Sequence, residues 1–311
     1  MKKTVLIFGI SSFVGSNLAQ ALKDEYRIIG TYFKTPVEIP GITSFPCDVL
    51  KKEYVANLIG LVKPDVTIYA IGLSSLSECK MNPKTADALN SAGAVNVCTA
   101  SERNSSKFIY ISSSYVLGGE DQLYKEGDTP FPNTVYGNSL SSTEFWIQRS
   151  CLNYLILRCS PLYGRGYGPK HPNWFEVVQA ALAQNRPLIA DDSVITGFLD
   201  VAILGKVLKS FLSSNVTNRL FQISSRDSLT RYEFAKLIAK TFKKDENLIQ
   251  RTTIPFPNEN STKMGSKNSA GLYCFRMDTY NVEDFLGASM PTIADSLQIT
   301  FKRLSGLNLA G

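Results

Sequence analysis

Two glycines near the start of the chain bracket a turn with the features of a dinucleotide site. An apolar run of strand length at 5–9 leads into this turn, and apolar residues then recur at helical spacing. Amides at such a helix N-terminus attract a pyrophosphate. The middle glycine of the usual fingerprint is replaced by Ser12, and a tight turn without a ligand would look similar. The residues predicted to bind the cofactor here are Gly9, Ser11, Ser12, Phe13, Val14 and Gly15.

The end of the second apolar run bears on the choice between NAD and NADP. An NAD site places an acidic residue there to accept from the ribose 2′-hydroxyl. Here the run ends at Tyr32 and continues through Phe33 to Lys34, without an acid. Lys34 would instead pair with a 2′-phosphate, which favours NADP(H) over NAD(H). The alternative is that Lys34 is a solvated surface lysine.

Residues suited to metal binding or to a Ser-His-Asp triad are sparse. The chain has one histidine, His171, within a turn-rich stretch that predicts a loop, and six cysteines without a C-x-x-C pair. We therefore predict no metal site. Scattered cysteines indicate reduced thiols, and the basic and apolar N-terminus is better explained by a strand than by a signal peptide, so we expect a cytoplasmic protein.

Alternating strands and helices must position these residues. Further strand-length apolar runs occur at 27–32, 66–72, 108–112, 154–158 and 220–225, and helical periodicity occurs between them, notably at 55–62 and 83–103. This alternation predicts an α/β fold: a Rossmann-like, doubly wound parallel sheet. We predict a dinucleotide-binding domain over 1–160 and a smaller C-terminal α/β substrate lobe over 161–311, with elements near 195–225 returning to the first domain.

Composition excludes several classes of protein. The 311 residues are 44% hydrophobic and 19% charged, which are ordinary globular values. The chain contains no run of 18 apolar residues, so no membrane span is predicted. The net charge of +6 is spread along the chain, so it suits an anionic small molecule rather than a nucleic acid.

Four motifs in order resemble those of the extended short-chain dehydrogenases/reductases, and most closely the dTDP-4-dehydrorhamnose reductase-like branch. The glycine turn is followed by YISSSYV at 110–116, by PNTVYGNS at 132–139 with Glu144 beyond it, and by LRCSPLYG at 157–164. The resemblance covers essentially the whole chain. It implies that Ser113 orients a substrate oxygen and that Tyr136, lying against the cofactor, exchanges a proton with that oxygen. The alternative for Tyr136 is a tyrosine that is merely packed.

One position departs from the family pattern. The family has Tyr-x-x-x-Lys, whereas position 140 is Leu140, and Glu144 fixes the register. A lysine one helical turn from Tyr136 would lower the tyrosine pKa and hold the nicotinamide ribose. Leucine does neither, so we expect weak or altered chemistry.

The resemblance also implies further cofactor and substrate positions. Cys47-Asp48-Val49 matches an adenine-flanking segment, and 70–72 follows a strand where a cofactor crosses an open sheet. The additional cofactor residues are Asp48, Val49, Ala70, Ile71, Gly72 and Asn90. A nucleotide-activated sugar is expected between the lobes, with Arg165 facing its diphosphate. The substrate candidates, each of which could instead be a loop or packing residue, are Ser74, Tyr163, Arg165, Asn173 and Phe198.

Two functions stay open at this point. The first is an NADP-dependent reductase or epimerase acting on a 4-keto nucleotide-activated deoxysugar. The second is a catalytically inactive member that binds cofactor or sugar nucleotide as a regulatory subunit, which Leu140 favours. A dehydratase is set aside because Ser114 and Tyr115 stand where it needs Asp-Glu. A homodimer or a regulatory partner is also left open.

Overall fold

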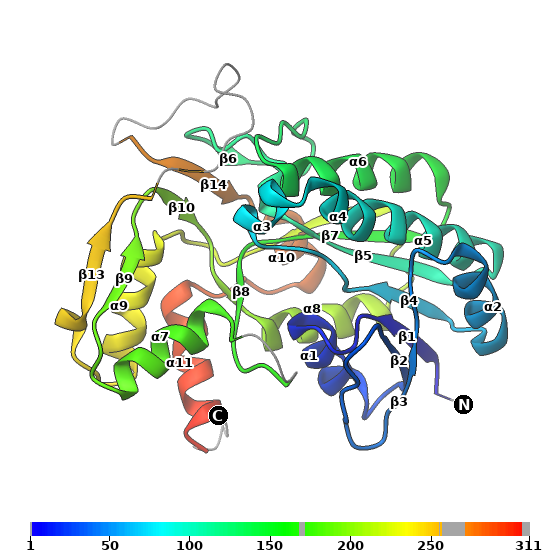
Figure 1. The fold of residues 1–311 in the computed structure, drawn as a ribbon, viewed down its shortest axis with the longest axis horizontal. Coiled ribbons are helices and arrows are strands. Elements are labelled where there is room, and N and C mark those ends of the chain that lie inside the picture. Colours follow the sequence, from blue (N-terminus) through cyan, green and yellow to red (C-terminus); the bar gives the residue numbers. More distant parts are fainter. Residues whose placement is uncertain (1, 168–171, 255, 257–270, 307–311) are drawn as a thin grey trace.

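A seven-stranded parallel sheet forms the centre of the molecule (Figure 1). The computed structural model describes residues 2–167, 172–254, 256 and 271–306, so His171 lies outside the described residues. The strand order is β12-β7-β5-β4-β1-β2-β3. The strands are β1 (Thr4–Phe8), β2 (Arg27–Tyr32), β3 (Thr43–Pro46), β4 (Val66–Tyr69), β5 (Lys107–Ser113), β7 (Tyr154–Cys159) and β12 (Arg219–Ile223). The expected doubly wound parallel sheet is confirmed.

Helices cover both faces of this sheet, which explains why its inner strands are almost entirely apolar. One face packs against α1 (Phe13–Leu22), α8 (Val201–Ser213) and α10 (Tyr280–Leu286). The other face packs against α2 (Lys52–Val62), α5 (Gly93–Arg103) and α6 (Val135–Ser150). None of the helices in the described ranges is long and apolar enough to span a membrane.

The segment expected as one helix over 83–103 has three parts. It consists of α4 (Pro83–Asp87), the π-helical turn η1 (Ala88–Ala92) and α5. A short helix α3 (Leu76–Met81) precedes it. Asn90 lies within η1, and single π turns are frequent at functional sites.

The second part of the molecule packs around its own apolar cluster. Its helices are α7 (Trp174–Ala183), α9 (Arg231–Thr241) and α11 (Ile293–Leu304). The expected Thr230–Glu233 capping box begins α9. Short strands complete it: β8 (Leu162–Tyr163) pairs with β11 (Leu199–Asp200), β9 (Leu188–Asp191) pairs with β13 (Ile249–Thr252), and β10 (Val194–Thr196) and β6 (Leu123–Tyr124) flank β14 (Tyr273–Met277). The domain boundary at residue 160 stays a prediction.

The cysteines were expected to be six reduced thiols. The sulfur atoms of Cys98, on α5, and Cys151, at the end of α6, are in contact. Their Cα atoms, however, are 7.3 Å apart, beyond the roughly 4.4–6.8 Å that a disulfide spans. The expectation of reduced thiols therefore stays a prediction at this pair. The remaining cysteines, Cys47, Cys79, Cys159 and Cys274, are free and buried.

Candidate active site

The predicted cofactor residues meet at the carboxyl edge of the sheet. Gly9 follows β1, Ala70 follows β4, and Ser113 ends β5. The neighbours of β1 are β2 on one side and β4 on the other, so the chain reverses its winding direction between β1 and β4. In open parallel sheets, ligands bind at such a switch point.

Close packing explains both glycines of the first turn. Gly9 has φ +85°, and a Cβ there would lie 2.6 Å from Cγ1 of Ile71 and 2.9 Å from the carbonyl oxygen of Ala70. A Cβ on Gly15 would lie 2.2 Å from the carbonyl oxygen of Gly9. Only glycine fits either position without a backbone shift. The turn therefore keeps the close approach of strand and helix that a dinucleotide site needs.

Ser12 has a definite role in place of the missing glycine. It is the N-cap of α1, and its hydroxyl accepts from the Gly15 amide at 2.9 Å. The same hydroxyl donates to the carbonyl of Ala70 at 2.9 Å and so ties the turn to the end of β4. Between the glycines, Ile10 is fully buried, and the half-buried residues are Ser11, Ser12, Phe13 and Val14. This cradle at a helix N-terminus fits a pyrophosphate group.

Asn90 fixes the chain that leaves β4. Its Oδ1 accepts from the amide of Leu73 at 2.8 Å, and its Nδ2 donates to Leu73 at 3.1 Å and to the hydroxyl of Ser139 at 3.0 Å. A Cβ on Gly72 would lie 2.8 Å from Oδ1 of Asn90. Asn90 therefore links the exit of β4 to α6 and borders the site through these bonds.

The ribose side of the site is more open. Tyr32 lines a hollow of about 600 Å³ together with Val37 and Ser44. Lys34 is exposed, and its Nζ lies 5.3 Å from the centre of the Phe33 ring. On the neighbouring loop, Asp48 accepts from the Leu50 amide at 3.0 Å, and Val49 is buried. The five residues directly after β2 include no acid, whereas Glu38, the sixth, lines the same hollow as Tyr32.

Ser113 and Tyr136 are brought together although 23 positions separate them. Thr134 caps α6 by accepting from the Gly137 amide at 3.0 Å, and Tyr136 lies in the first turn. A Cβ on Gly137 would lie 2.0 Å from the carbonyl oxygen of Tyr115, so glycine lets α6 begin against the end of β5. The Ser113 hydroxyl lies close enough to the Tyr136 phenol to lower its pKa.

Burial dominates the ionisation of Tyr136. Desolvation raises the pKa of the phenol well above its ordinary value, and the neighbouring Ser113 hydroxyl opposes that shift in part. The thiols of Cys79 and Cys159 and the phenol of Tyr115 raise the pKa further. None of these groups is a cation. Tyr136 is therefore a neutral phenol at physiological pH.

Leu140 lies one turn beyond Tyr136 and is fully part of the core. Its side chain is 4% exposed and belongs to the apolar cluster between the sheet and α5 and α6. The nearby Glu144 forms a buried ion pair with Arg158, from Nη2 to Oε2 at 2.7 Å, and accepts from Ser112 at 2.5 Å. The Arg158 guanidinium is thus paired with Glu144.

The substrate candidates divide into buried and accessible residues. Tyr163 is 2% exposed, and its hydroxyl shares a 2.6 Å hydrogen bond with Ser296. Phe198 is 3% exposed and stacks on Phe234 with ring centres 4.1 Å apart. These two positions match the packing alternative. By contrast, Ser74 and Arg165 are exposed and Asn173 is half-buried at the N-cap of α7.

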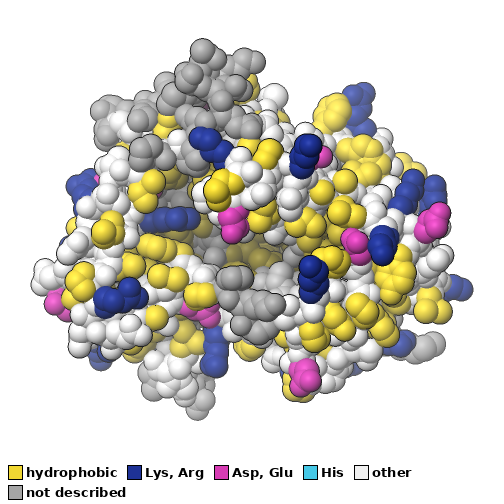
Figure 2. Space-filling view, viewed as in Figure 1, with side chains coloured by type: hydrophobic (Ala, Val, Ile, Leu, Met, Phe, Trp, Pro, Cys, Tyr) yellow, Lys and Arg dark blue, Asp and Glu magenta, His cyan; other side chains and the backbone are white. Residues whose placement is uncertain are grey.

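A cluster of aromatic side chains beside Tyr136 was not predicted from the sequence. The ring centre of Tyr115 lies 6.1 Å from that of Tyr136 and 4.9 Å from that of Phe275. Burial raises the pKa of Tyr115, and the nearby cation of Arg231 opposes this. The guanidinium of Arg231 in turn lies 5.5 Å from the Trp174 ring centre. The space-filling view shows a hollow near the middle of the face that it presents (Figure 2).

The fold and this site define a class of protein: a Rossmann-fold protein with a site for a nicotinamide cofactor, of the extended short-chain dehydrogenase/reductase type. Within this class, residues 1–302 match the family described as RmlD substrate binding domain, and the chain belongs to that family. It is 26% identical over 302 residues to a probable low-salt glycan biosynthesis reductase of Haloferax volcanii, covering 94% of this chain and 95% of the relative.

Two further comparisons bear on function. The chain is 27% identical over 240 residues to methionine adenosyltransferase 2 subunit beta of Danio rerio, covering 75% of this chain and 72% of the relative. Its fold is similar to the solved dTDP-4-dehydrorhamnose reductase of Bacillus anthracis in complex with NADP. That match has a TM-score of 0.80 and 22% identity, and it covers 97% of this chain and 100% of the other.

Proposed function

We propose that this protein is an NADP-dependent reductase of a 4-keto nucleotide-activated deoxysugar. The observation that carries the proposal is the proximity of Tyr136 and Ser113 at the sheet edge that also holds the glycine turn. NADPH, when bound, supplies the hydride for the carbonyl carbon. Tyr136 then donates its proton to the carbonyl oxygen, and Ser113 orients that oxygen.

The protonated form of Tyr136 suits one direction of this reaction, while its raised pKa makes the phenol a weak acid and the reaction slow. A neutral phenol is the form that donates a proton, so reduction of a ketone is supported across neutral pH. The reverse oxidation needs the phenolate as a base, which burial without a nearby lysine disfavours. We therefore expect a slow reductase rather than an efficient epimerase, since an epimerase must run both steps.

The remaining residues supply binding. The turn from Gly9 to Gly15 holds the pyrophosphate, Lys34 pairs with the 2′-phosphate, and Arg165 faces the sugar diphosphate. The support for Lys34 is the absence of an acid at 33–37, directly after β2, and the support for NADP is the similar reductase solved with NADP. The cytoplasmic location expected from the sequence stays a prediction.

The test is NADPH oxidation with dTDP-4-dehydrorhamnose and other 4-keto nucleotide sugars. We expect slow turnover that Tyr136→Phe lowers by about 10²-fold or more, because a general acid typically contributes 10²–10⁴-fold. NADPH affinity, followed by fluorescence, should change little in this variant. Turnover that survives Tyr136→Phe would remove Tyr136 from the mechanism.

A second candidate is a non-catalytic subunit that binds the cofactor and regulates a partner enzyme. Leu140 favours it, because an apolar buried residue replaces the family lysine, and so does the similarity to a subunit of methionine adenosyltransferase. This candidate predicts tight NADPH binding with no oxidation of any 4-keto nucleotide sugar. That result would replace the reductase proposal.

A further inference from the structure

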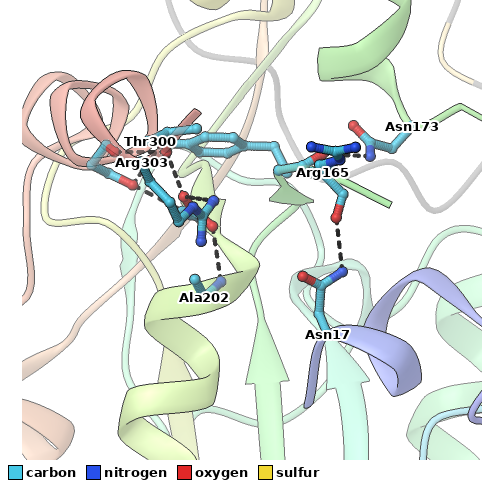
Figure 3. Close-up of polar contacts among 10 residues, drawn as sticks. Asn17, Arg165, Asn173, Ala202, Thr300 and Arg303 are labelled. Carbon is cyan, nitrogen blue, oxygen red and sulfur yellow. Dashed lines mark hydrogen bonds and ion pairs between the residues drawn. The ribbon is translucent and has the colours of Figure 1, made fainter. Parts of the chain in front are cut away.

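The loop at 164–166, which carries Arg165, is held by the cofactor-binding helix α1. Asn17, 8% exposed, donates from Nδ2 to the carbonyl of Phe13 at 2.9 Å and to the carbonyl of Arg165 at 3.0 Å. Figure 3 shows the Asn17 amide pointing from α1 to the backbone of Arg165. One side chain thus joins the first turn of α1, next to the proposed pyrophosphate site, to the loop that begins the second lobe.

The other side of the loop is anchored in the second lobe. Asn173 donates from Nδ2 to the carbonyl of Gly164 at 2.8 Å, and the amide of Gly166 donates to Oε1 of Glu176 at 2.8 Å. Asn173 and Glu176 form the capping box of α7. The loop is therefore clamped between the helix of the cofactor site and a helix of the substrate lobe (Figure 3).

A partly buried ion pair lies against the start of this loop. Gly164 has φ +136°, and a Cβ there would lie 3.1 Å from Oδ1 of Asp200. Asp200 is fully buried, caps α8 through the Ala202 amide at 2.8 Å, and pairs with Arg303 of α11 at 2.7 Å. Because Gly164 packs against this framework, we expect a shift of α1 to move Arg165 and Gly166 rather than Gly164.

We propose that Asn17 is a positioning residue that couples cofactor binding at α1 to the order of the Arg165 loop and so to substrate binding. The inference rests on the proposed function. A ligand that orders the first turn of α1 also orders the Phe13 carbonyl and the Asn17 amide that it holds. Asn17 then holds the Arg165 backbone, which places the exposed guanidinium at the substrate side. The coupling is reciprocal, so substrate raises cofactor affinity by the same factor.

Hydrogen exchange of the Gly166 amide reports on this coupling, because that amide is bonded within the clamp. We expect saturating NADPH to slow exchange at Gly166 by about 3–10-fold in the wild type, the range for one net hydrogen bond. Asn17→Ser retains a hydroxyl for the Phe13 carbonyl but is too short to reach Arg165. In Asn17→Ser and in Asn17→Ala, NADPH should still protect residues 9–15 but no longer Gly166.

Two controls separate the coupling from general effects. Gln20→Ala, on the same helix, should leave the NADPH-dependent protection of Gly166 unchanged. Arg165→Ala keeps the backbone carbonyl, so it should retain the protection while raising the substrate KM and leaving the NADPH affinity unchanged.

The possible outcomes are distinguishable. The coupling is overturned if Asn17→Ser keeps the NADPH-dependent protection, or if NADPH binds the wild type and protects 9–15 but not Gly166. If NADPH does not bind at all, the proposed cofactor fails. Exchange in the ligand-free protein then tests the contact between Asn17 and the Arg165 loop. Faster Gly166 exchange in Asn17→Ser supports this contact, and unchanged exchange overturns it.

Discussion

The glycine turn at 9–15 and the first turns of α6 serve the same edge of the sheet, but they tolerate change differently. In the turn, Ser12 replaces a glycine and yet caps α1 and bonds to Ala70. In α6, Leu140 stands where the family resemblance implies a lysine, and none of the groups that most affect the Tyr136 pKa supplies a positive charge. Pyrophosphate binding depends on backbone amides and on space, which several side chains permit. Proton transfer depends on the charge of one side chain, so binding can survive where chemistry weakens.

The largest expected effect is on the glycine turn. Gly15→Ala places a Cβ 2.2 Å from the Gly9 carbonyl oxygen, so the strand and helix must separate. We expect NADPH affinity, measured by fluorescence titration, to fall on the order of 10–100-fold, as for overpacking that costs 1–3 kcal/mol. Gly60→Ala in α2 is the control, because its Cβ would meet its nearest atom at 3.9 Å. Unchanged affinity in Gly15→Ala would place the cofactor elsewhere.

A restored lysine tests the other half of the comparison. Leu140→Lys places an ammonium one helical turn from Tyr136, which lowers the phenol pKa and should raise kcat by about 10-fold. The position is 4% exposed, so the melting temperature should also fall. Leu140→Met, similar in volume, should change neither quantity, and adding Tyr136→Phe should abolish the gain. A fast wild type that Leu140→Lys slows would contradict this account.

Cofactor choice should respond more weakly. Lys34 is exposed, and a contact between exposed charges is worth roughly 1 kcal/mol or less. Lys34→Ala should therefore weaken NADPH binding by about 3–5-fold at low salt and leave NADH binding unchanged. Lys52→Ala, at an exposed lysine of α2, should alter neither. If the two cofactors bind equally well to the wild type, Lys34 is a surface lysine.

The smallest expected effect is that of pH on the wild type. A proton donor works below its pKa and loses its proton as the pH rises through that value. Because burial raises the pKa of Tyr136 above its ordinary value near 10, kcat/KM should show no loss from Tyr136 between about pH 6.5 and 9. In Leu140→Lys the alkaline loss should move to lower pH. An alkaline loss near neutrality in the wild type would reveal an unrecognised cation.

Local patterns predicted the fold where burial is periodic or continuous. The segment 27–32 was predicted with its observed bounds because four of its six residues are buried, with β1 on one side and β3 on the other. β3 was missed because Thr43–Pro46 is an edge strand with mostly exposed residues. The π turn was missed as well, since Asn90 bonds to Leu73 and Ser139, which are remote in sequence.

The site was predictable only where a motif is local. The glycine turn, Ser113 and Tyr136 lie in short recognisable segments, whereas Tyr115 meets Phe275 from 160 positions away. Asn17 gave no signal, because its partner is a backbone carbonyl 148 positions away. Tyr163 and Phe198 were chosen by position in a motif or loop, and no local pattern could show that their rings pack inside the second lobe.

The place of β12 in the central sheet has a consequence for biosynthesis. β7 is buried along its whole length and is covered at its outer edge by β12, which emerges about 60 residues later. Until the ribosome has released residues 219–223, the nascent chain presents an apolar, unpaired strand edge. A fragment that ends at residue 160 keeps that edge permanently, so it should aggregate rather than fold as an independent nucleotide-binding unit.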